Sequence, residues 1–575
     1  MLSKKALLNY FPLIFVLLLA IFLRFLWLDK VPNAIGGDEL NYVLTAKSIA
    51  LYGTDLTGKW NPLSIFFFNY PPGQTQAELL YFLLIPFVGF TNFSLFWARA
   101  ENGVLGVLIV YLIYLIASKL FNKQIGLAAG LVSAINPWFI YLSRTSYEMQ
   151  AATFFYLLSF YALMFFKGKK ILLSIPILLL AFYSYIATKV FFLPFVLTMI
   201  YYGYFQVNKR KFKKEYLTVL IFSVLLVAVF FLSLKAHSSV SRLGEIFTPA
   251  NPEIARQVDS IRKASVQTPL TNLIVNKYTV YFRTIIVKEF SIFSFDYLFL
   301  YGDNFFSIFS HGLFYYLDAL FLILGLAFTY AKQRKTFFLL LSLTLLATIP
   351  HLIHGSSTEN FTPHVSLIFP FLIIFIAVGL WGSITLFKNK IYFYSSMAVI
   401  GILYIFLLLN FLNIYFYQFP LQGNFDFKMR LLSKYITISN EKTVVYSTAS
   451  GDQFSKYLFY SNSVTSKNKK QIENDYRTGN YTLNNVTFLG CDASLDPSLD
   501  RNKIIIFDDL CNFIGKERPR LSIARISDGG EDYAIFNDTV CSKYPLKPYP
   551  QILSLNQFNI GRMSPRDFCE NFITR

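Results

Sequence analysis

Long uninterrupted runs of apolar residues constrain this chain more than any other feature of its sequence. A helix that crosses the hydrocarbon of a bilayer needs about 20 apolar residues, at about 1.5 Å of rise each. Eleven runs approach that length, and only 15% of the residues are charged, whereas a soluble domain carries about 25%. These runs predict an α-helical polytopic membrane protein with about eleven spans.

The first run follows Lys4 and Lys5, and no small-residue cleavage site comes after it, so it is interpreted as an uncleaved span. A shorter apolar stretch at 76–90 is broken by Pro86 and is expected to lie on, or dip into, the outer face. The predicted spans are 10–28, 103–120, 125–142, 151–166, 171–187, 190–205, 216–234, 313–330, 336–353, 365–387 and 391–415.

Basic turns between the spans predict the orientation, because Lys and Arg are retained on the cytoplasmic side. With these turns and the N-terminus in the cytoplasm, the long loops 29–102 and 235–312 fall outside a plasma membrane. The formal charge of +19 is then topogenic and does not indicate a nucleic-acid partner. The basic turns are 119–123, 167–170, 209–214, 332–335 and 388–390.

The composition changes after about residue 416, which divides a membrane half, 1–415, from a tail, 416–575. Charged residues return there beside short β-type runs, so the tail is predicted to be a soluble α/β domain on the outer side. An even number of cysteines confined to an exported domain indicates two disulfides, although four unpaired buried thiols remain an alternative. No C-x₂-C spacing favours zinc. The four cysteines are Cys491, Cys511, Cys541 and Cys569.

Two adjacent carboxylates, Asp38 and Glu39, follow the first predicted span at the boundary of membrane and water. On a helix, Asp38 shares a face with Tyr42, four residues on, while Glu39 points about 100° away. Charges at a membrane boundary are costly and usually functional. The alternative is a helix-capping acid on an interfacial helix.

Further polar groups collect at the other predicted outer boundaries. Each also has an ordinary explanation: a surface turn at Tyr70, an i,i+4 ion pair between Arg144 and Glu148, a snorkelling Lys189, and polar loop histidines at 351–364. No P-loop, dinucleotide fingerprint, H-E-x-x-H or G-x-S-x-G occurs, so cytosolic nucleotide chemistry is disfavoured.

These groups, taken in order, resemble the GT-C superfamily of membrane glycosyltransferases. The nearest branches are the protein O-mannosyltransferases and the bacterial aminoarabinose transferases that modify lipid A. The resemblance covers roughly residues 7–415, and its most specific element is the Asp38-Glu39 pair. The other matching segments are Tyr70-Pro71-Pro72, Arg99, Asn136-Pro137-Trp138 through Arg144 to Glu148, Tyr185–Lys189 and Thr362-Pro363-His364.

The resemblance implies a GT-C fold and inverting transfer of a sugar from a dolichyl or undecaprenyl phosphate to a protein, lipid or glycan acceptor. Asp38 is then the catalytic base, Glu39 its partner or an acceptor-positioning group, and Glu148 a second acid where relatives commonly hold aspartate. No cofactor is required, and a divalent metal is not indicated because the membrane half lacks D-x-D. The implied phosphate contacts are Arg144, Lys189, Arg283 and His364, and the substrate-positioning residues are Tyr42, Tyr70, Tyr301 and Asp303.

Two other functions are compatible with the sequence. One is a transporter or flippase of lipid-linked glycans, but such proteins place charges near the bilayer midplane and show repeated halves. Here the charges gather at one face and no repeat is visible. The other is a non-catalytic subunit that keeps the GT-C architecture, against which the Asp38-Glu39 pair argues.

Overall fold

The structure, a computed structural model, describes most of the chain and leaves short gaps between its elements. The turn that contains Tyr70 lies outside the described residues, so nothing is added to that prediction. The described residues are 4–67, 78–203, 214–236, 248–266, 268–304, 306–308, 311–355, 359–421, 427–491, 502–512, 521–549, 552 and 554–575.

Apolar helices make up much of the described part of residues 4–421, and the chain is an integral membrane protein. Five helices of the described chain are long and apolar enough to cross a bilayer. Several other predicted runs form shorter apolar helices, so the number of eleven spans stays a prediction. The five are Leu95–Leu120, Lys214–Leu232, Arg334–Leu352, Thr362–Thr385 and Lys390–Leu421, and the shorter ones are Tyr10–Phe25, Glu78–Gly89, Lys123–Ile135, Met149–Phe165 and Ile186–Tyr202.

Proline explains one of the interruptions. The predicted run 125–142 is divided at Asn136, whose side chain accepts the Phe139 N–H at 3.0 Å and so caps a new helix that starts at Pro137. Proline suits that first position because it has no N–H to leave unpaired. The helices of this half are α1 (Lys4–Phe25), α2 (Gly37–Tyr52), α3 (Glu78–Leu84), α4 (Leu95–Leu120), α5 (Lys123–Ile135), α6 (Pro137–Leu142), α7 (Met149–Phe165), α8 (Ser174–Phe182), α9 (Lys189–Tyr202), α10 (Lys214–Ala236), α11 (Pro252–Lys263), α12 (Thr271–Ile274), α13 (Lys277–Ile292), α14 (Tyr316–Lys332), α15 (Arg334–Leu346), α16 (Ile349–Leu352), α17 (Thr362–Val365), α18 (Phe369–Thr385) and α19 (Lys390–Asn413).

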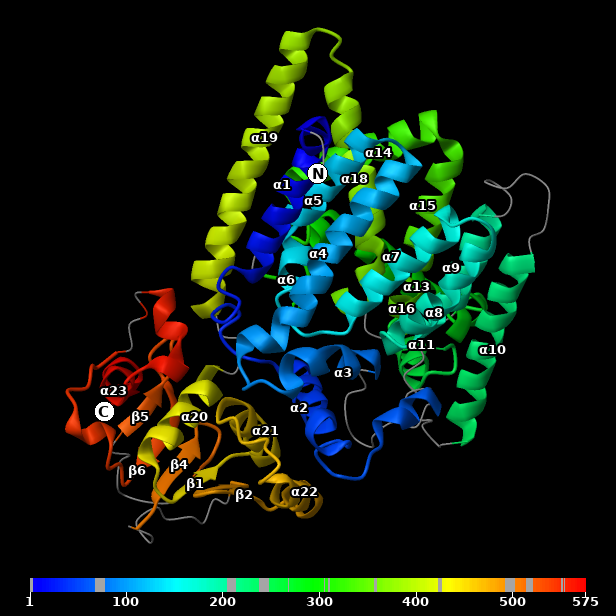
Figure 1. Ribbon diagram of the computed structural model, residues 1–575. Coiled ribbons are helices and arrows are strands. Elements are labelled where there is room, and N and C mark those ends of the chain that lie inside the picture. The colour runs from blue at the N-terminus through cyan, green and yellow to red at the C-terminus, as the bar shows by residue number, and fades with distance from the viewer. Residues whose placement is uncertain are drawn as a thin grey trace.

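The centre of the bundle is α18, and α19 lies at its edge (Figure 1). Of the span that contains α18, 78% is buried, compared with 11% of the span that contains α19. α18 approaches α14 very closely, since a Cβ on Gly325 would meet the Phe375 carbonyl oxygen and one on Gly379 would meet that of Phe321. Small residues allow such contacts between membrane helices.

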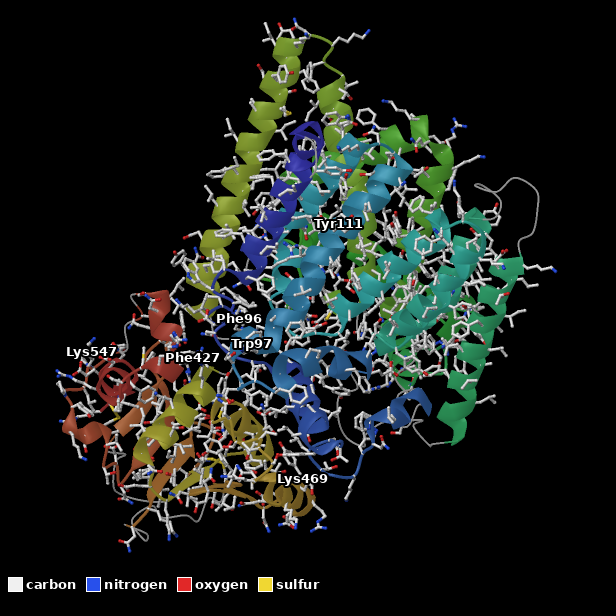
Figure 2. All side chains as sticks on the ribbon, in the orientation of Figure 1. Phe96, Trp97, Tyr111, Phe427, Lys469 and Lys547 are labelled. Carbon is white, nitrogen blue, oxygen red and sulfur yellow. A yellow bond between two sulfur atoms is a disulfide. The ribbon has the colours of Figure 1, made fainter. Side chains whose placement is uncertain are left out.

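Apolar side chains also cover the outside of the bundle, as expected where lipid replaces water. Leu18, Leu232 and Ile323 are each at least 60% exposed. Figure 2 shows side chains projecting outward along the helices, with Tyr111 midway along α4 and Trp97 near its start. Trp97 is 40% exposed and lies at the end nearest the tail, where aromatic side chains commonly mark the membrane boundary.

The tail folds as a seven-stranded sheet of order β2-β3-β1-β4-β6-β5-β7. β1 is parallel to both neighbours, with Thr443 aligned to Val486 and to Ile504, and the remaining pairs are antiparallel. Helices α20 and α21 lie between the sheet and the membrane half (Figure 1). The elements are β1 (Thr443–Tyr446), β2 (Tyr481–Leu483), β3 (Val486–Leu489), β4 (Ile504–Asp508), β5 (Leu521–Ala524), β6 (Glu531–Phe536), β7 (Ile573–Thr574), α20 (Phe427–Ser439), α21 (Ser450–Tyr460), α22 (Lys469–Thr478) and α23 (Pro565–Phe572).

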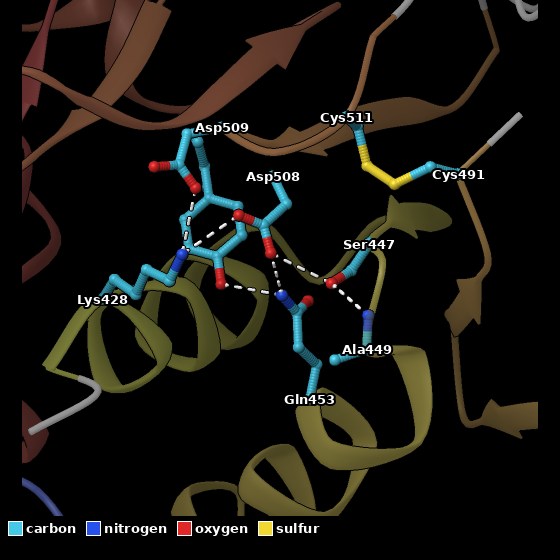
Figure 3. Close-up of a disulfide and its surroundings, with 9 residues drawn as sticks. Lys428, Ser447, Ala449, Gln453, Cys491, Asp508, Asp509 and Cys511 are labelled. Carbon is cyan, nitrogen blue, oxygen red and sulfur yellow. Dashed lines mark hydrogen bonds and ion pairs between the residues drawn. A yellow bond between two sulfur atoms is a disulfide. The ribbon is translucent and has the colours of Figure 1, made fainter. Parts of the chain in front are cut away.

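The four cysteines form two disulfides, Cys491–Cys511 and Cys541–Cys569. The first lies beside a polar network at the end of β4 (Figure 3). There Lys428 Nζ contacts Asp508 at 3.0 Å and Asp509 at 3.1 Å. This network connects α20 to the end of the central strand β4, and the disulfide joins the segments that follow β3 and β4.

Candidate active site

Asp38 and Glu39 are adjacent in the chain but lie in different environments. Both belong to the first turn of α2, where the helix dipole favours negative charge. Successive side chains of a helix point about 100° apart. Asp38 is exposed, whereas Glu39 is fully buried. Of the pair, Asp38 is therefore the carboxylate that a substrate can reach.

Glu39 is held inside the protein by an ion pair. Its Oε1 lies 3.0 Å from Arg99 Nε and accepts the Ser146 N–H at 3.0 Å. Both members of the pair have no exposed surface. Two buried charges in direct contact stabilise each other, and losing one leaves the other uncompensated. This arrangement holds the first turn of α2 in place. The two predicted roles of Glu39, partner of Asp38 or acceptor-positioning group, stay predictions.

Arg99 extends this network to the segment ahead of Asp38. Its terminal nitrogens donate to the carbonyl of Pro32 at 2.7 Å and to that of Ala34 at 2.5 Å. The guanidinium is fully buried, so these bonds are shielded from water. Arg99 thus fixes both the approach to α2 and its first turn relative to α4.

Two tyrosines, Tyr42 and Tyr147, lie within electrostatic reach of both Asp38 and Glu148. Tyr42 hydrogen-bonds Glu148, and burial, with the charges of Glu148 and Asp38, holds the pKa of Tyr42 well above its ordinary range. Burial, with the charges of Glu39 and Asp38, likewise raises the pKa of Tyr147. Both phenols therefore stay protonated and can act as O–H donors. We call Asp38, Tyr42, Tyr147 and Glu148 the carboxylate cluster.

Asp303 anchors the turn that precedes α17. Its Oδ2 accepts the Thr362 N–H at 2.8 Å and also the Thr362 hydroxyl. The Tyr297 hydroxyl donates to Thr362 Oγ1 at 3.0 Å. Tyr301, by contrast, is 62% exposed. Asp303 therefore organises the loop, and Tyr301 is the predicted substrate-positioning residue that stays open to solvent.

A line of aromatic rings leads from the carboxylate cluster to His364. Tyr147 lies edge-on to Phe306 with ring centroids 5.2 Å apart, and Phe306 lies edge-on to Phe361 at 5.1 Å. Phe361 in turn lies 4.7 Å from the ring of His364. Residues that are far apart in the sequence therefore form one continuous line of ring contacts.

Arg144, a predicted phosphate ligand, is fully buried and used by the protein itself. Its Nε donates to the Tyr415 hydroxyl at 3.1 Å, and its charge lies 5.1 Å from the centre of the Phe416 ring. Its other nitrogens donate to main-chain carbonyls at 2.9–3.1 Å, those of Leu23, Arg24 and Val31. With its donors engaged in this way, Arg144 joins α1 and the end of α6 to the start of the tail. Its predicted role as a phosphate ligand stays a prediction.

Lys189 is similarly engaged. Its Nζ lies 2.5 Å from Glu78 Oε2 and donates to the Phe182 carbonyl at 2.8 Å. Both charges are almost completely buried. Lys189 thus holds α3 against α9, which gives the predicted phosphate ligand a protein counter-ion in this structure.

Lys288 and three histidines, His364 among them, form a second cluster. Lys288 Nζ donates to the carbonyls of His354 at 2.9 Å and Gly355 at 2.8 Å. The His354 and His364 rings lie 4.5 Å apart, and the charges of Lys288 and His354 act on both His351 and His364. We call Lys288, His351, His354 and His364 the histidine cluster.

Two buried ring nitrogens of this cluster have no hydrogen-bond partner among the described residues. Nε2 of His351 and Nδ1 of His364 make no hydrogen bond within the described part of the chain. Buried polar atoms are nearly always hydrogen-bonded, so two together indicate a ligand or water. Burial also lowers the pKa of Lys288 to about 8. A bound anion would satisfy the ring nitrogens and favour the charged lysine.

Sequence reasoning did not single out Lys288, and it named Arg99 only as a matching residue of the resemblance, without a role. Lys288 lies on α13, whose sequence shows no motif that marks a binding site. Only the contact of Lys288 with the chain at 354–355 places it beside the histidines. The available signal was the three histidines within fourteen positions. Arg283, which was predicted, is exposed on α13 and lies about 140° around the helix from Lys288.

Three histidines so close together also raise the question of a metal site. Across the described residues, no three His, Cys, Asp or Glu side chains gather as a metal ion would need. The histidine cluster is instead combined with a lysine, a cation that would repel a metal ion and attract an anion.

The tail contacts the segment that leads into α2. The Ile35 N–H donates to the Tyr460 hydroxyl at 3.1 Å, and Arg430 donates to the Asn33 carbonyl at 2.7 Å. Tyr52, at the far end of α2, donates to the Thr465 carbonyl at 2.7 Å. We call this end of the helical half, which holds both clusters and faces the tail, the site end.

No protein-family model and no curated protein sequence matches this chain. Among solved structures, the chain is similar to the oligosaccharyltransferase of Archaeoglobus fulgidus, with 14% identity and a TM-score of 0.49, covering 80% of this chain and 64% of that one. It is also similar to ArnT of Cupriavidus metallidurans, with 10% identity and a TM-score of 0.45, covering 87% and 94%. The structure of ArnT bound to undecaprenyl phosphate gives 11% identity and a TM-score of 0.46, covering 92% and 98%. The chain thus spans slightly less than two thirds of the archaeal enzyme.

Proposed function

We propose that this protein is a glycosyltransferase that moves a sugar from a polyprenyl-phosphate carrier to an acceptor hydroxyl or amine at the site end. The observation that carries the proposal is the combination of an exposed carboxylate, Asp38, with the histidine cluster, in which two buried ring nitrogens make no hydrogen bond within the described part of the chain. A line of aromatic rings joins the two. The site end, with the N-terminus on the opposite side, is proposed to face the exterior.

The reaction is a single displacement with inversion. Asp38 accepts the proton of the acceptor as the acceptor atom bonds to the anomeric carbon of the sugar. The bond from that carbon to the phosphate oxygen breaks, and its electron pair stays on the phosphate. Lys288 and the ring nitrogens of His351 and His364 stabilise the charge that develops on the leaving group.

The protein supplies orientation to this step through buried bonds. Glu39 and Arg99 fix the first turn of α2, so Asp38 does not need to be ordered during the reaction. Such preorganisation raises the rate because the entropy of ordering the catalytic group is lost on folding and not during the reaction. Tyr42 and Tyr147, protonated donors beside Asp38, are suited to hold the acceptor or a sugar hydroxyl.

Transfer by purified protein in lipid tests the proposal. Radiolabelled polyprenyl-phosphate sugars and a crude acceptor extract are supplied to the wild type, to Asp38→Asn and to Asp259→Asn, which removes an exposed carboxylate from α11. We expect Asp38→Asn to lose roughly 10²–10⁴-fold in rate with an unchanged melting temperature, as for loss of a general base. Asp259→Asn should match the wild type. A folded wild type that consumes none of the donors would contradict the proposal and favour a transporter or scaffold.

A further inference from the structure

At the opposite end of the helical half lies a cavity of about 220 Å³. Two basic turns contribute to its lining, and a third follows directly after its lining residue Thr385. The turns are 119–123, 332–335 and 386–390, and we call this region the basic end. It lies at the far end of the bundle from the tail (Figure 1). It is remote from both clusters of the site end, so the reaction proposed above leaves it unexplained.

The walls of the cavity are apolar and its rim is polar. Phe328, Val378 and Trp381 line it from α14 and α18, while Lys332 and Gln333 lie where α14 ends. One to two turns further into the bundle, α14 and α18 touch through Gly325 and Gly379. The space between the two helices therefore closes inward, and the cavity is a shallow cup beside the helix ends.

Glycine helps to shape this cup. A Cβ on Gly382 would come 2.4 Å from Cδ2 of Phe328, so the Phe328 ring occupies space that a side chain at 382 would need. Lys332 lies over the same ring, with its Nζ 5.6 Å from the centroid. The cation is thus positioned above an apolar wall.

The charge around the cup has one sign. Seven exposed cations belong to the three turns or lie at the helix ends that they join, and none of the three turns contains an Asp or Glu. Juxtamembrane basic residues attract anionic lipids by about 1 kcal/mol each. The seven are Lys119, Lys123, Lys332, Arg334, Lys335, Lys388 and Lys390.

The depth of the cup matches the lipid boundary. The helices Leu95–Leu120, Thr362–Thr385 and Lys390–Leu421 begin or end here, which places the cup where hydrocarbon meets headgroups. Trp381 has the amphipathic ring that is typical of this depth. At about 220 Å³ the cup is smaller than the 300 Å³ or so of compact small-molecule sites and suits a short segment of chain.

We propose that the cup binds an anionic phospholipid of the leaflet at this end, with an acyl segment against Phe328 and Trp381 and the headgroup phosphate on Lys332. The positive-inside rule predicts that this leaflet is the cytoplasmic one. The proposal does not depend on transferase activity, since it concerns the other end of the bundle.

Quenching of Trp381 by brominated lipids tests this binding. Wild type and Trp381→Phe are reconstituted in nanodiscs of phosphatidylcholine that contain increasing fractions of brominated phosphatidylglycerol, and the difference signal isolates Trp381 from the other four tryptophans. We expect half-quenching at a lower mole fraction for brominated phosphatidylglycerol than for brominated phosphatidylcholine. Equal mole fractions for the two lipids would overturn the proposal.

Charge variants separate a built site from general attraction. Lys332→Gln should raise the half-quenching mole fraction of the anionic lipid about fivefold, while Lys332→Arg should preserve it. Lys335→Gln, which removes a cation that does not line the cup, should have little effect. An equal loss in Lys335→Gln and Lys332→Gln would reduce the effect to surface charge, and stronger quenching by a brominated polyprenyl phosphate would replace the phospholipid with the lipid carrier.

Discussion

The two ends of the helical half carry positive charge in opposite ways. At the site end, Arg99, Arg144 and Lys189 are buried and donate to carboxylates, carbonyls or a hydroxyl of the protein itself. At the basic end, cations such as Lys332 and Lys335 are exposed. Because the first group is buried, its substitution is expected to lower stability strongly. Substitution of the exposed second group is expected to change stability little.

This contrast shows that the formal charge of +19 combines cations of two kinds, buried ones with protein partners and exposed ones. A buried cation must have partners because desolvation costs several kcal/mol per ion. An exposed cation interacts weakly through high dielectric and remains available to lipid headgroups. The histidine cluster is the exception at the site end, since it combines a buried cation with ring nitrogens that lack partners in the described structure.

The largest effect is expected for Arg99→Ala. It leaves the Glu39 carboxylate buried without its counter-ion, which costs roughly 3–5 kcal/mol. We expect a strongly lowered melting temperature and loss of transfer, measured on protein in the same detergent. Arg334→Ala at the basic end is the matched control and should stay within about 0.5 kcal/mol. Similar losses in both variants would remove the distinction between the two ends.

Loss of Lys288 should impair donor binding more than stability. The residue donates two hydrogen bonds at the histidine cluster, and a charge-assisted bond to phosphate contributes about 1.5–3 kcal/mol. Lys288→Met is therefore expected to weaken binding of a polyprenyl phosphate by about tenfold or more, measured by titration calorimetry. Arg283→Met, a neighbouring exposed cation, should bind as the wild type does. Weaker binding in Arg283→Met than in Lys288→Met would instead support Arg283, the phosphate contact predicted from the sequence.

The pH dependence of donor binding should report Lys288. Burial lowers its pKa to about 8, so it is protonated below pH 8 and loses its proton above. Binding to the charged form should therefore be constant below that pH and fall by up to about tenfold per pH unit above it. Lys288→Arg keeps its charge throughout and should abolish this fall. An unchanged profile in Lys288→Arg would assign the titration to another group.

The smallest effect tests the contact of the tail with the site end. Tyr460→Phe removes the hydroxyl that accepts the Ile35 N–H, a bond expected to contribute about 0.5–1.5 kcal/mol. Because residue 35 leads into α2, we expect a reduced kcat with a nearly unchanged donor KM. Tyr549→Phe, an exposed tyrosine of the tail, is the control. A change in stability without any change in kcat would limit the tail to a packing role.

Parts of this arrangement could be predicted because they depend on neighbours in the chain. The division of Asp38 from Glu39 is one example, since helical geometry alone sends adjacent side chains about 100° apart. The division of the run 125–142 was missed, although Asn136-Pro137 is a local helix-start signal. The roles predicted for Arg144 and Lys189 depend on long-range partners, Tyr415 and Glu78, that no spacing reveals.

The sequence by itself determined that this is a helical membrane protein with a differently composed tail, because the hydrophobic length of a helix and the frequency of charge are properties of local segments. Only the tertiary structure decided which charges are structural and which are open. That distinction depends on contacts between α2 and α4, and between α13 and the chain at 354–355, which lie at least 60 residues apart. Burial and pairing of a charged side chain depend on how distant segments pack together. The sequence of any one segment therefore does not reveal whether its charge is structural or open to a ligand.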